Sequence, residues 1–272
     1  RPLNQSLTAD EITKITGIMN GTTNYILTKM SNEGSSYQEV LKEAQELGYA
    51  ERNPEADVEG YDACRKIAIL TSLAGGKTVN FEEITTEGIT KISNEDFKYA
   101  EKMGCVIKLL ATSYRKDGKV YAITSPFLID TTHPLYNVNG VLNGIYVSGN
   151  MVGDVMFFGA GAGKLPTASA VVGDIIDCVK HKGTNVMVIW DDEKLTLADT
   201  SEEERRFFVR VPADVTEATV KELFGDVNVV KADGLDNEYG FVTGIMTEGK
   251  FAEAAAKVNV ISRIRIDDTK LG

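Results

Sequence analysis

Ionisable side chains gather between residues 51 and 66 of this chain, and they include the groups that acid–base chemistry uses. Asp62 and Lys66 are four positions apart, so on a helix they would lie on one face, one turn from each other. A lysine held beside a carboxylate is an arrangement suited to proton transfer. The densest part of this group consists of Glu51, Asp57, Glu59, Asp62, Arg65 and Lys66.

Two interpretations of the Asp62–Lys66 spacing are open. The simpler one is an exposed ion pair, which would stabilise the helix by ~0.3–0.5 kcal/mol and have no further role. Two features favour a functional pair. Apolar spacing through Ala63, Ile67 and Leu70 predicts a largely buried helix, and buried charges are usually paired for function. The polar loop ahead of that helix also brings further carboxylates to the helix start.

The elements around this cluster follow from capping residues, glycines and apolar spacing. Thr8 with Glu11 three positions later predicts a helix start, and the segment 8–30 ends in a small polar turn that leads into apolar helix. Residues 36–48 form an amphipathic helix closed by a glycine, residues 49–57 form a loop, and residues 58–74 form the helix of the cluster.

Farther along the chain the pattern changes from helical to extended. Strands are predicted at 102–114 and 119–129, glycines punctuate short strands between 140 and 153, and a helix follows at 165–180. The strongly charged stretch 191–205 is predicted to be a linker. Beyond it the order is strand–helix–strand–strand–helix–strand, at 206–211, 215–224, 227–233, 239–246, 249–258 and 260–266.

That order over about 65 residues is the ferredoxin-like arrangement. We therefore predict an α+β protein of two domains. Residues 1–200 form a mixed-sheet domain, and residues 203–272 form a ferredoxin-like βαββαβ domain.

Composition excludes several classes of partner. The chain of 272 residues has a net charge of −11 and no dense cluster of lysine and arginine, which argues against nucleic acid and anionic membrane. The three cysteines are widely spaced and odd in number, so neither a disulfide framework nor a zinc site is predicted. No apolar run approaches the roughly 18 residues of a membrane span, and a cytoplasmic protein is expected.

Three motifs, in order, resemble those of homoserine dehydrogenases. The central one follows the pattern G-Y-x-E and then D-x-x-G-x-D-x-x-x-K, from Gly48 to Lys66. The preceding motif runs from Gly17 to Leu27, and the following one is the glycine-rich run from Gly159 to Ala170.

The resemblance implies oxidation of L-homoserine to L-aspartate 4-semialdehyde with NAD(P), and the reverse reaction, in threonine and methionine synthesis. It implies that five residues bind the substrate. Of these, Lys66 also donates and accepts the proton, and Asp62 holds the lysine in position. The five residues are Thr22, Tyr49, Glu51, Asp62 and Lys66. Chemistry agrees, because the substrate ammonium suits a carboxylate such as Glu51 and its hydroxyl needs a base. A buried lysine whose pKa burial lowers would serve as that base.

The glycine-rich run is neither a Walker loop nor G-x-G-x-x-G, and the residues alone favour a tight packing turn. The resemblance implies that Gly161 and Gly163 contact the nicotinamide end of the cofactor. The nucleotide-binding fold, which would hold most of the NAD(P), is expected to precede Arg1 in a longer protein. The metal site of the family is also expected upstream, so no metal is predicted here.

The segment 203–272 resembles an ACT domain, which implies an amino-acid effector. The turn after its first strand reads Pro212-Ala213-Asp214-Val215 and lacks the usual glycine, which weakens the case for the usual effector pocket. The family also implies a homodimer. Two alternatives of another class stay open: an amino-acid-sensing regulatory module, and a dimerisation module without activity. The cluster between Glu51 and Lys66 favours the enzyme, because neither alternative requires it.

Overall fold

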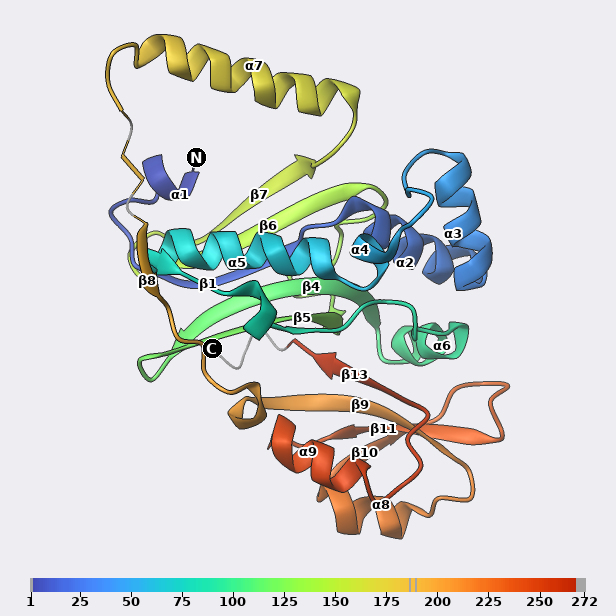
Figure 1. The fold of residues 1–272 in the computed structure, drawn as a ribbon. Helices are drawn as coiled ribbons and strands as arrows, with labels where there is room; N and C mark the ends of the chain where they lie inside the picture. Colours follow the sequence, from blue (N-terminus) through green and yellow to red (C-terminus); the bar gives the residue numbers. More distant parts are fainter. Residues whose placement is uncertain (1, 186, 189, 268–272) are drawn as a thin grey trace.

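One large mixed sheet organises the chain (Figure 1). The computed structural model describes residues 2–185, 187–188 and 190–267. Within these, the strand order is β10-β11-β9-β13-β5-β4-β1-β6-β7, with β12 pairing β9 and β3 pairing β5. Neighbours along this order are antiparallel except β13 and β5, which run parallel, as do β3 and β5. The mixed sheet predicted from the sequence is confirmed.

The described elements up to residue 200 build the larger part of this sheet, a separate sheet of two short strands, and eight helical segments. The strands are β1 (Ile12–Ile18), β2 (Lys77–Thr78), β3 (Thr85–Thr86), β4 (Cys105–Lys116), β5 (Lys119–Asp130), β6 (Leu142–Gly149), β7 (Gly153–Ala160) and β8 (Asp191–Lys194). The helices are α1 (Pro2–Gln5), α2 (Gly21–Glu33), α3 (Tyr37–Glu46), α4 (Glu55–Val58), α5 (Tyr61–Gly75), η1 (Phe81–Glu83), α6 (Asn94–Lys102) and α7 (Lys164–Lys180).

The remaining elements, up to residue 267, form what we call the C-terminal unit. They are η2 (Thr200–Glu202), β9 (Glu204–Pro212), α8 (Glu217–Phe224), β10 (Val227–Val230), β11 (Glu238–Thr243), β12 (Met246–Thr247), α9 (Glu248–Ala255) and β13 (Ser262–Ile266). Strand–helix–strand–strand–helix–strand is thus the main order observed. The last five residues of the predicted second domain, 268–272, lie outside the described residues.

Local chemistry explains the β4–β5 hairpin, the best-predicted part of the fold. Lys116 pairs with Lys119, so only Asp117 and Gly118 form the turn. Both have positive φ, at 51° and 75°, which is the backbone of the two-residue turn that matches strand twist. Asp and Gly tolerate that region better than other residues, so the sequence determines this register.

Apolar packing covers both faces of the sheet. On one face, α2 and α5 bury Ile26, Leu27 and Ile67 in the largest core. On the other, Leu135 and Val138 of the segment after β5 close a smaller core. Helix α7 differs, because none of its residues is buried and it stands apart from the sheet in Figure 1.

Three sequence predictions about elements are corrected. Residues 12–18 form the strand β1 rather than a helix capped by Thr8, because β4 and β6 pair with both of its edges. The predicted loop 49–57 includes the start of α4. The predicted linker 191–205 is not a free linker: β8 pairs with β2 within it, and Glu203 and Arg205 are buried. The division into two domains stays a prediction, since one sheet runs through both parts.

Candidate active site

The site is built where two helices begin side by side, at the N-terminal ends of α2 and α5. Gly60 precedes α5 with a φ of 82°, and a Cβ there would lie 3.3 Å from the methyl groups of Thr86 and Thr124. Glycine is therefore favoured by both backbone and space. The turn it makes directs α5 so that Asp62 lies in its first turn, where the helix dipole favours a negative charge.

Asp62 and Lys66 form the ion pair that their spacing predicts. Lys66 Nζ donates to Asp62 Oδ2 at 2.7 Å and to the carbonyl oxygen of Met19 at 2.9 Å. The Lys66 side chain is 48% exposed and that of Asp62 is 32% exposed. The prediction of deep burial is therefore wrong for these two side chains, because they lie on the side of α5 opposite its buried Ala63, Ile67 and Ala68.

Asn20 joins this pair to a second carboxylate, that of Asp57. Its Nδ2 donates to Asp57 Oδ1 at 2.7 Å and to Asp62 Oδ2 at 2.9 Å. Burial raises the pKa of the Asp57 carboxyl, the nearby charges of Asp62 and Glu51 add to this, and the Asn20 hydrogen bond opposes it. Together Asp57, Asp62 and Lys66 form what we call the carboxylate–lysine cluster.

Sequence reasoning noted Asp57 among the ionisable residues but assigned a role to neither Asp57 nor Asn20. The signal for Asn20 was its place directly before Gly21-Thr22-Thr23 at the start of an apolar helix, because asparagine is a preferred N-cap residue. In the structure Asn20 is the N-cap of α2, and its side chain accepts from Thr23 N at 2.9 Å.

Thr22 and Tyr49 lie in contact beside the cluster. The Thr22 hydroxyl donates to the carbonyl oxygen of Tyr49 at 2.6 Å, and the Tyr49 ring packs edge-on against Tyr25, 5.0 Å between centroids. Glu51 is exposed, and its carbonyl oxygen accepts from Gln45. Its charge acts on Asp57. The predicted site residues from Thr22 to Lys66 are thus gathered around the starts of α2 and α5.

The predicted cofactor contacts, Gly161 and Gly163, lie in the exposed turn between β7 and α7. A Cβ built on Gly161 would lie 2.8 Å from the side chain of Asn143, and one built on Gly21 would lie 3.5 Å from the same side chain. Both glycines therefore approach Asn143, which places this turn beside the start of α2. Gly163 has a φ of 110° and precedes α7 without a side-chain cap.

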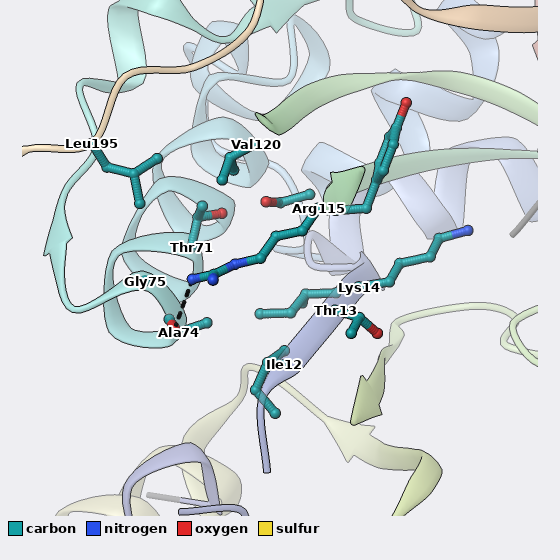
Figure 2. A pocket seen from close by; sticks show the side chains of 12 residues that line it. Ile12, Thr13, Lys14, Thr71, Ala74, Gly75, Arg115, Val120 and Leu195 are labelled. Carbon is teal, nitrogen blue, oxygen red and sulfur yellow. Dashed lines mark hydrogen bonds between the residues drawn. The ribbon is translucent and has the colours of Figure 1, made fainter. Parts of the chain in front are cut away.

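One small cavity and one buried lysine can be set aside as alternative centres. Figure 2 shows a small cavity at the far end of α5, where Arg115 extends toward the carbonyl oxygen of Ala74. Its volume of about 20 Å³ suits a water molecule rather than an amino acid. Lys108 is only 2% exposed, with its ammonium bonded to Val138 O and to the side chains of Asn24 and Asn139. Burial lowers the pKa of Lys108 to about 8, but a substrate could not reach it.

Two further properties of the described ranges concern metal-ligating side chains and membrane-spanning helices. No group of three or more His, Cys, Asp or Glu side chains there is arranged to hold a metal ion. Within the same part of the chain, every helix is too short or too polar to cross a membrane. The carboxylate–lysine cluster instead carries more negative than positive charge, with Glu51 at its edge. Such a cluster favours a ligand that bears an ammonium group and exchanges a proton.

The sequence of this chain matches one family of known proteins. The family described as "Homoserine dehydrogenase" matches residues 1–176. The homoserine dehydrogenase of Bacillus subtilis is 46% identical over 181 residues, and that of Synechocystis is 51% identical over 183 residues. Each match covers 66% of this chain and 42% of the relative. The chain therefore spans less than half the length of these curated relatives.

Solved structures extend the likeness to almost the whole chain. A homoserine dehydrogenase from Thiobacillus denitrificans matches with a TM-score of 0.88 and 32% identity, over 98% of this chain and 67% of that one. The Staphylococcus aureus homoserine dehydrogenase at pH 7.5 matches with a TM-score of 0.79 and 31% identity, over 96% and 66%. A hyperthermophilic archaeal homoserine dehydrogenase mutant in complex with NADPH matches with a TM-score of 0.55 and 32% identity, over 66% and 51%.

Proposed function

The chain belongs to the homoserine dehydrogenase family, and on this premise we propose that it is the substrate half of an NAD(P)-dependent homoserine dehydrogenase. The reaction is the oxidation of L-homoserine to L-aspartate 4-semialdehyde and its reverse, in threonine and methionine biosynthesis. One observation carries the proposal. A lysine of α5 is held by a carboxylate and a backbone carbonyl, beside further carboxylates and close to the start of α2.

The substrate amino acid would be bound by its two charged ends. Its ammonium group is attracted to the net negative charge of Glu51 and the carboxylate–lysine cluster. Its carboxylate suits the first amides of α2 near Thr22, because the opening amides of a helix lack intrahelical acceptors and lie at the positive end of the helix dipole. Thr22 and Tyr49, joined by a hydrogen bond, form the wall between these two ends.

Lys66 exchanges the proton of the substrate hydroxyl. In oxidation the lysine accepts this proton, and in reduction it returns the proton to the forming alcohol oxygen. Asp62 and the Met19 carbonyl accept two N–H bonds of Lys66, so the third position on Nζ faces the substrate: a lone pair of the neutral amine in oxidation, a proton of the ammonium in reduction. Their contacts fix the position of Nζ, which proton transfer over hydrogen-bond distance requires.

The chain's own residues fit one end of the cofactor. The Gly161–Gly163 turn lies beside the start of α2 through Asn143, and its exposed backbone can approach a flat ring closely. Bound nicotinamide supplies the hydride acceptor. We propose that most of the NAD(P) contacts come from a nucleotide-binding domain outside this chain, since the sequence carries no G-x-G-x-x-G. The archaeal relative solved with NADPH supports this class of cofactor.

We also propose that the C-terminal unit is an ACT-like regulatory domain of a cytoplasmic homodimer. Its strand order β10-β11-β9-β13, with α8 and α9 as the two connecting helices, supports a ferredoxin-like unit. A cavity of about 340 Å³ beside Ala213, Thr216 and Tyr239 is large enough for an amino-acid effector. This second function, amino-acid sensing, would accompany the enzymatic one.

Replacing the proton-transfer group tests the enzymatic proposal. In the intact enzyme, Lys66→Ala should lower kcat by about 10²–10⁴-fold, the usual contribution of a general acid–base group, with a smaller change in KM. Lys42→Ala is the matched control. Lys42 is a more exposed lysine that also lies on a helix and pairs with a carboxylate one turn away, that of Glu46. A Lys66→Ala enzyme with nearly normal kcat would exclude the role assigned to Lys66.

A further inference from the structure

Asn20 does more than cap α2. We propose that Asn20 is a positioning residue that holds Asp57 and Asp62 as one carboxylate pair and so sets the geometry in which Asp62 presents Lys66. This rests on the proposed function for its catalytic meaning. The arrangement itself can be tested without turnover.

The Asn20 amide is fully used. Its Nδ2 has two protons, and the two short bonds to Asp57 and Asp62 consume both. Its Oδ1 accepts from the backbone N–H of Thr23 at 2.9 Å and is 3.1 Å from the Thr23 hydroxyl. With the amide flipped, its oxygen would face two carboxylate oxygens and its NH₂ would face a backbone N–H. Acceptors would then meet acceptors and a donor would meet a donor, so neither contact could be a hydrogen bond. The contacts therefore settle which way the amide faces.

The bridge connects three separate segments. Asn20 lies between β1 and α2, Asp57 lies in the short helix α4, and Asp62 lies in the first turn of α5. Asn20 and Thr23 are both buried, so the amide has little freedom to move. Asp62 Oδ2 also accepts from Lys66, so a displacement of Asn20 would shift the Asp62 carboxylate and with it the position of Lys66 Nζ.

Electrostatics explains why a donor is needed at this position. Two carboxylates directed at one point repel each other, and partial burial raises the pKa of Asp57 further. A shared N–H donor stabilises both charged forms without adding a net charge. A lysine or arginine at this position would instead offset the negative charge that attracts the substrate ammonium.

Two substitutions separate bridging from capping. Asn20→Ser keeps a good N-cap for α2, but one hydroxyl proton cannot bridge two carboxylates. Asn20→Asp also keeps a capping oxygen and replaces the shared donor by a third carboxylate. Ser36→Ala, which removes the cap of α3 away from the cluster, is the control for cap loss alone.

The measurements are carboxyl ¹³C NMR titration of Asp57 and calorimetric titration with L-homoserine, both on this chain. We expect the pKa of Asp57 to rise in Asn20→Ser and to rise more in Asn20→Asp, with no change in Ser36→Ala. Homoserine affinity should fall about tenfold or more in Asn20→Ser, since a hydrogen bond to a charged group typically contributes ~1.5–3 kcal/mol. Thermal unfolding should show that Asn20→Ser is folded.

The outcomes distinguish the inference from the proposed function. An unchanged Asp57 titration in both Asn20 variants would overturn the positioning role. A shift in Asn20→Ser that Ser36→Ala reproduces would overturn it too, because cap loss would then be the cause. If the Asp57 titration shifts as expected but homoserine fails to bind the unaltered chain, the proposed substrate fails and the positioning of the carboxylates is supported.

Discussion

Basic side chains pair with carboxylates in two regions of this molecule that differ in solvent exposure. At the start of α5, Lys66 is 48% exposed and donates two hydrogen bonds, to one carboxylate and one backbone carbonyl. Where the C-terminal unit meets the rest of the chain, Arg210 is 4% exposed and pairs with Asp96, which is 0% exposed. The same types of charge are open to a ligand in the first region and enclosed in the second.

The enclosed region is saturated with partners. Arg210 donates to Asp96 Oδ1 at 2.8 Å, to the Ser93 hydroxyl at 2.9 Å and to both carboxylate oxygens of Glu238. Arg265 is held in a similar way by Glu87, Glu248 and Ser125. No capacity is left for a substrate in such pairs. The comparison shows that exposure and unused donors, rather than the presence of charge, distinguish a candidate site from a structural junction.

The largest effect is expected from breaking the enclosed region. Arg210→Met leaves Asp96 and Glu238 without their main cation, and breaking a buried pair on one side destabilises a protein by about 3–5 kcal/mol. Urea unfolding of the chain measures this. Lys102→Met is the control, because its 3.9 Å pair with Asp233 is exposed. A loss below about 1 kcal/mol for Arg210→Met would contradict the contrast between the regions.

The second effect is a loss of folding stability at low pH. The guanidinium groups of Arg265 and Arg263 outweigh burial and lower the pKa of Glu87 from 4.5 to about 2, and His133 and Lys14 similarly lower that of Asp267 to about 2. The unfolded chain binds these protons at higher pH, so their stabilising effect is complete above about pH 4.5. It should be lost as pH falls toward 2.

Denaturant midpoints measured from pH 5 to pH 2 would check this acid sensitivity. The unaltered chain should lose stability steadily over that range. Glu87→Gln should start less stable and show a shallower decline, because one of the two carboxylates no longer titrates. Parallel declines in the two proteins would show that Glu87 does not carry the effect.

The smallest effect is expected at the open cluster. An exposed i,i+4 pair contributes ~0.3–0.5 kcal/mol, so Lys66→Ala should barely change the free energy of unfolding. In the intact enzyme the same substitution should lower kcat by about 10²–10⁴-fold. Urea unfolding of this variant beside Arg210→Met gives the comparison in one experiment. A loss of 3 kcal/mol or more for Lys66→Ala would mean that the cluster is structural.

Sequence reasoning succeeded where the signal is local. The two strands on either side of residues 117–118, the helix that begins near residue 36 and the Asp62–Lys66 spacing each depend on residues close together in the chain, and all three are observed. The order of elements in the C-terminal unit follows from similar signals. The motif from Gly48 to Lys66 also indicated the family that the comparisons show.

Sequence reasoning failed where residues far apart in the chain determine the local structure. Residues 12–18 carry isoleucines at three-residue spacing, which fits a helix, but pairing with β4 and β6 makes them a strand. The charges around residue 204 suggested a solvated linker, yet Glu203 is buried beside Tyr114 and Arg205 beside Glu248. The bridge from Asn20 to Asp57 spans 37 positions, and no spacing rule predicts it.

The central claim is that the starts of α2 and α5 bind an amino-acid substrate, and calorimetric titration of this chain with L-homoserine tests it most directly. We predict weak binding that falls at least tenfold in Glu51→Gln and is unchanged in Glu55→Gln, an exposed glutamate four residues away. Titration with NADP under the same conditions should show little or no binding. Homoserine binding that is absent, or equal in both variants, would contradict the account.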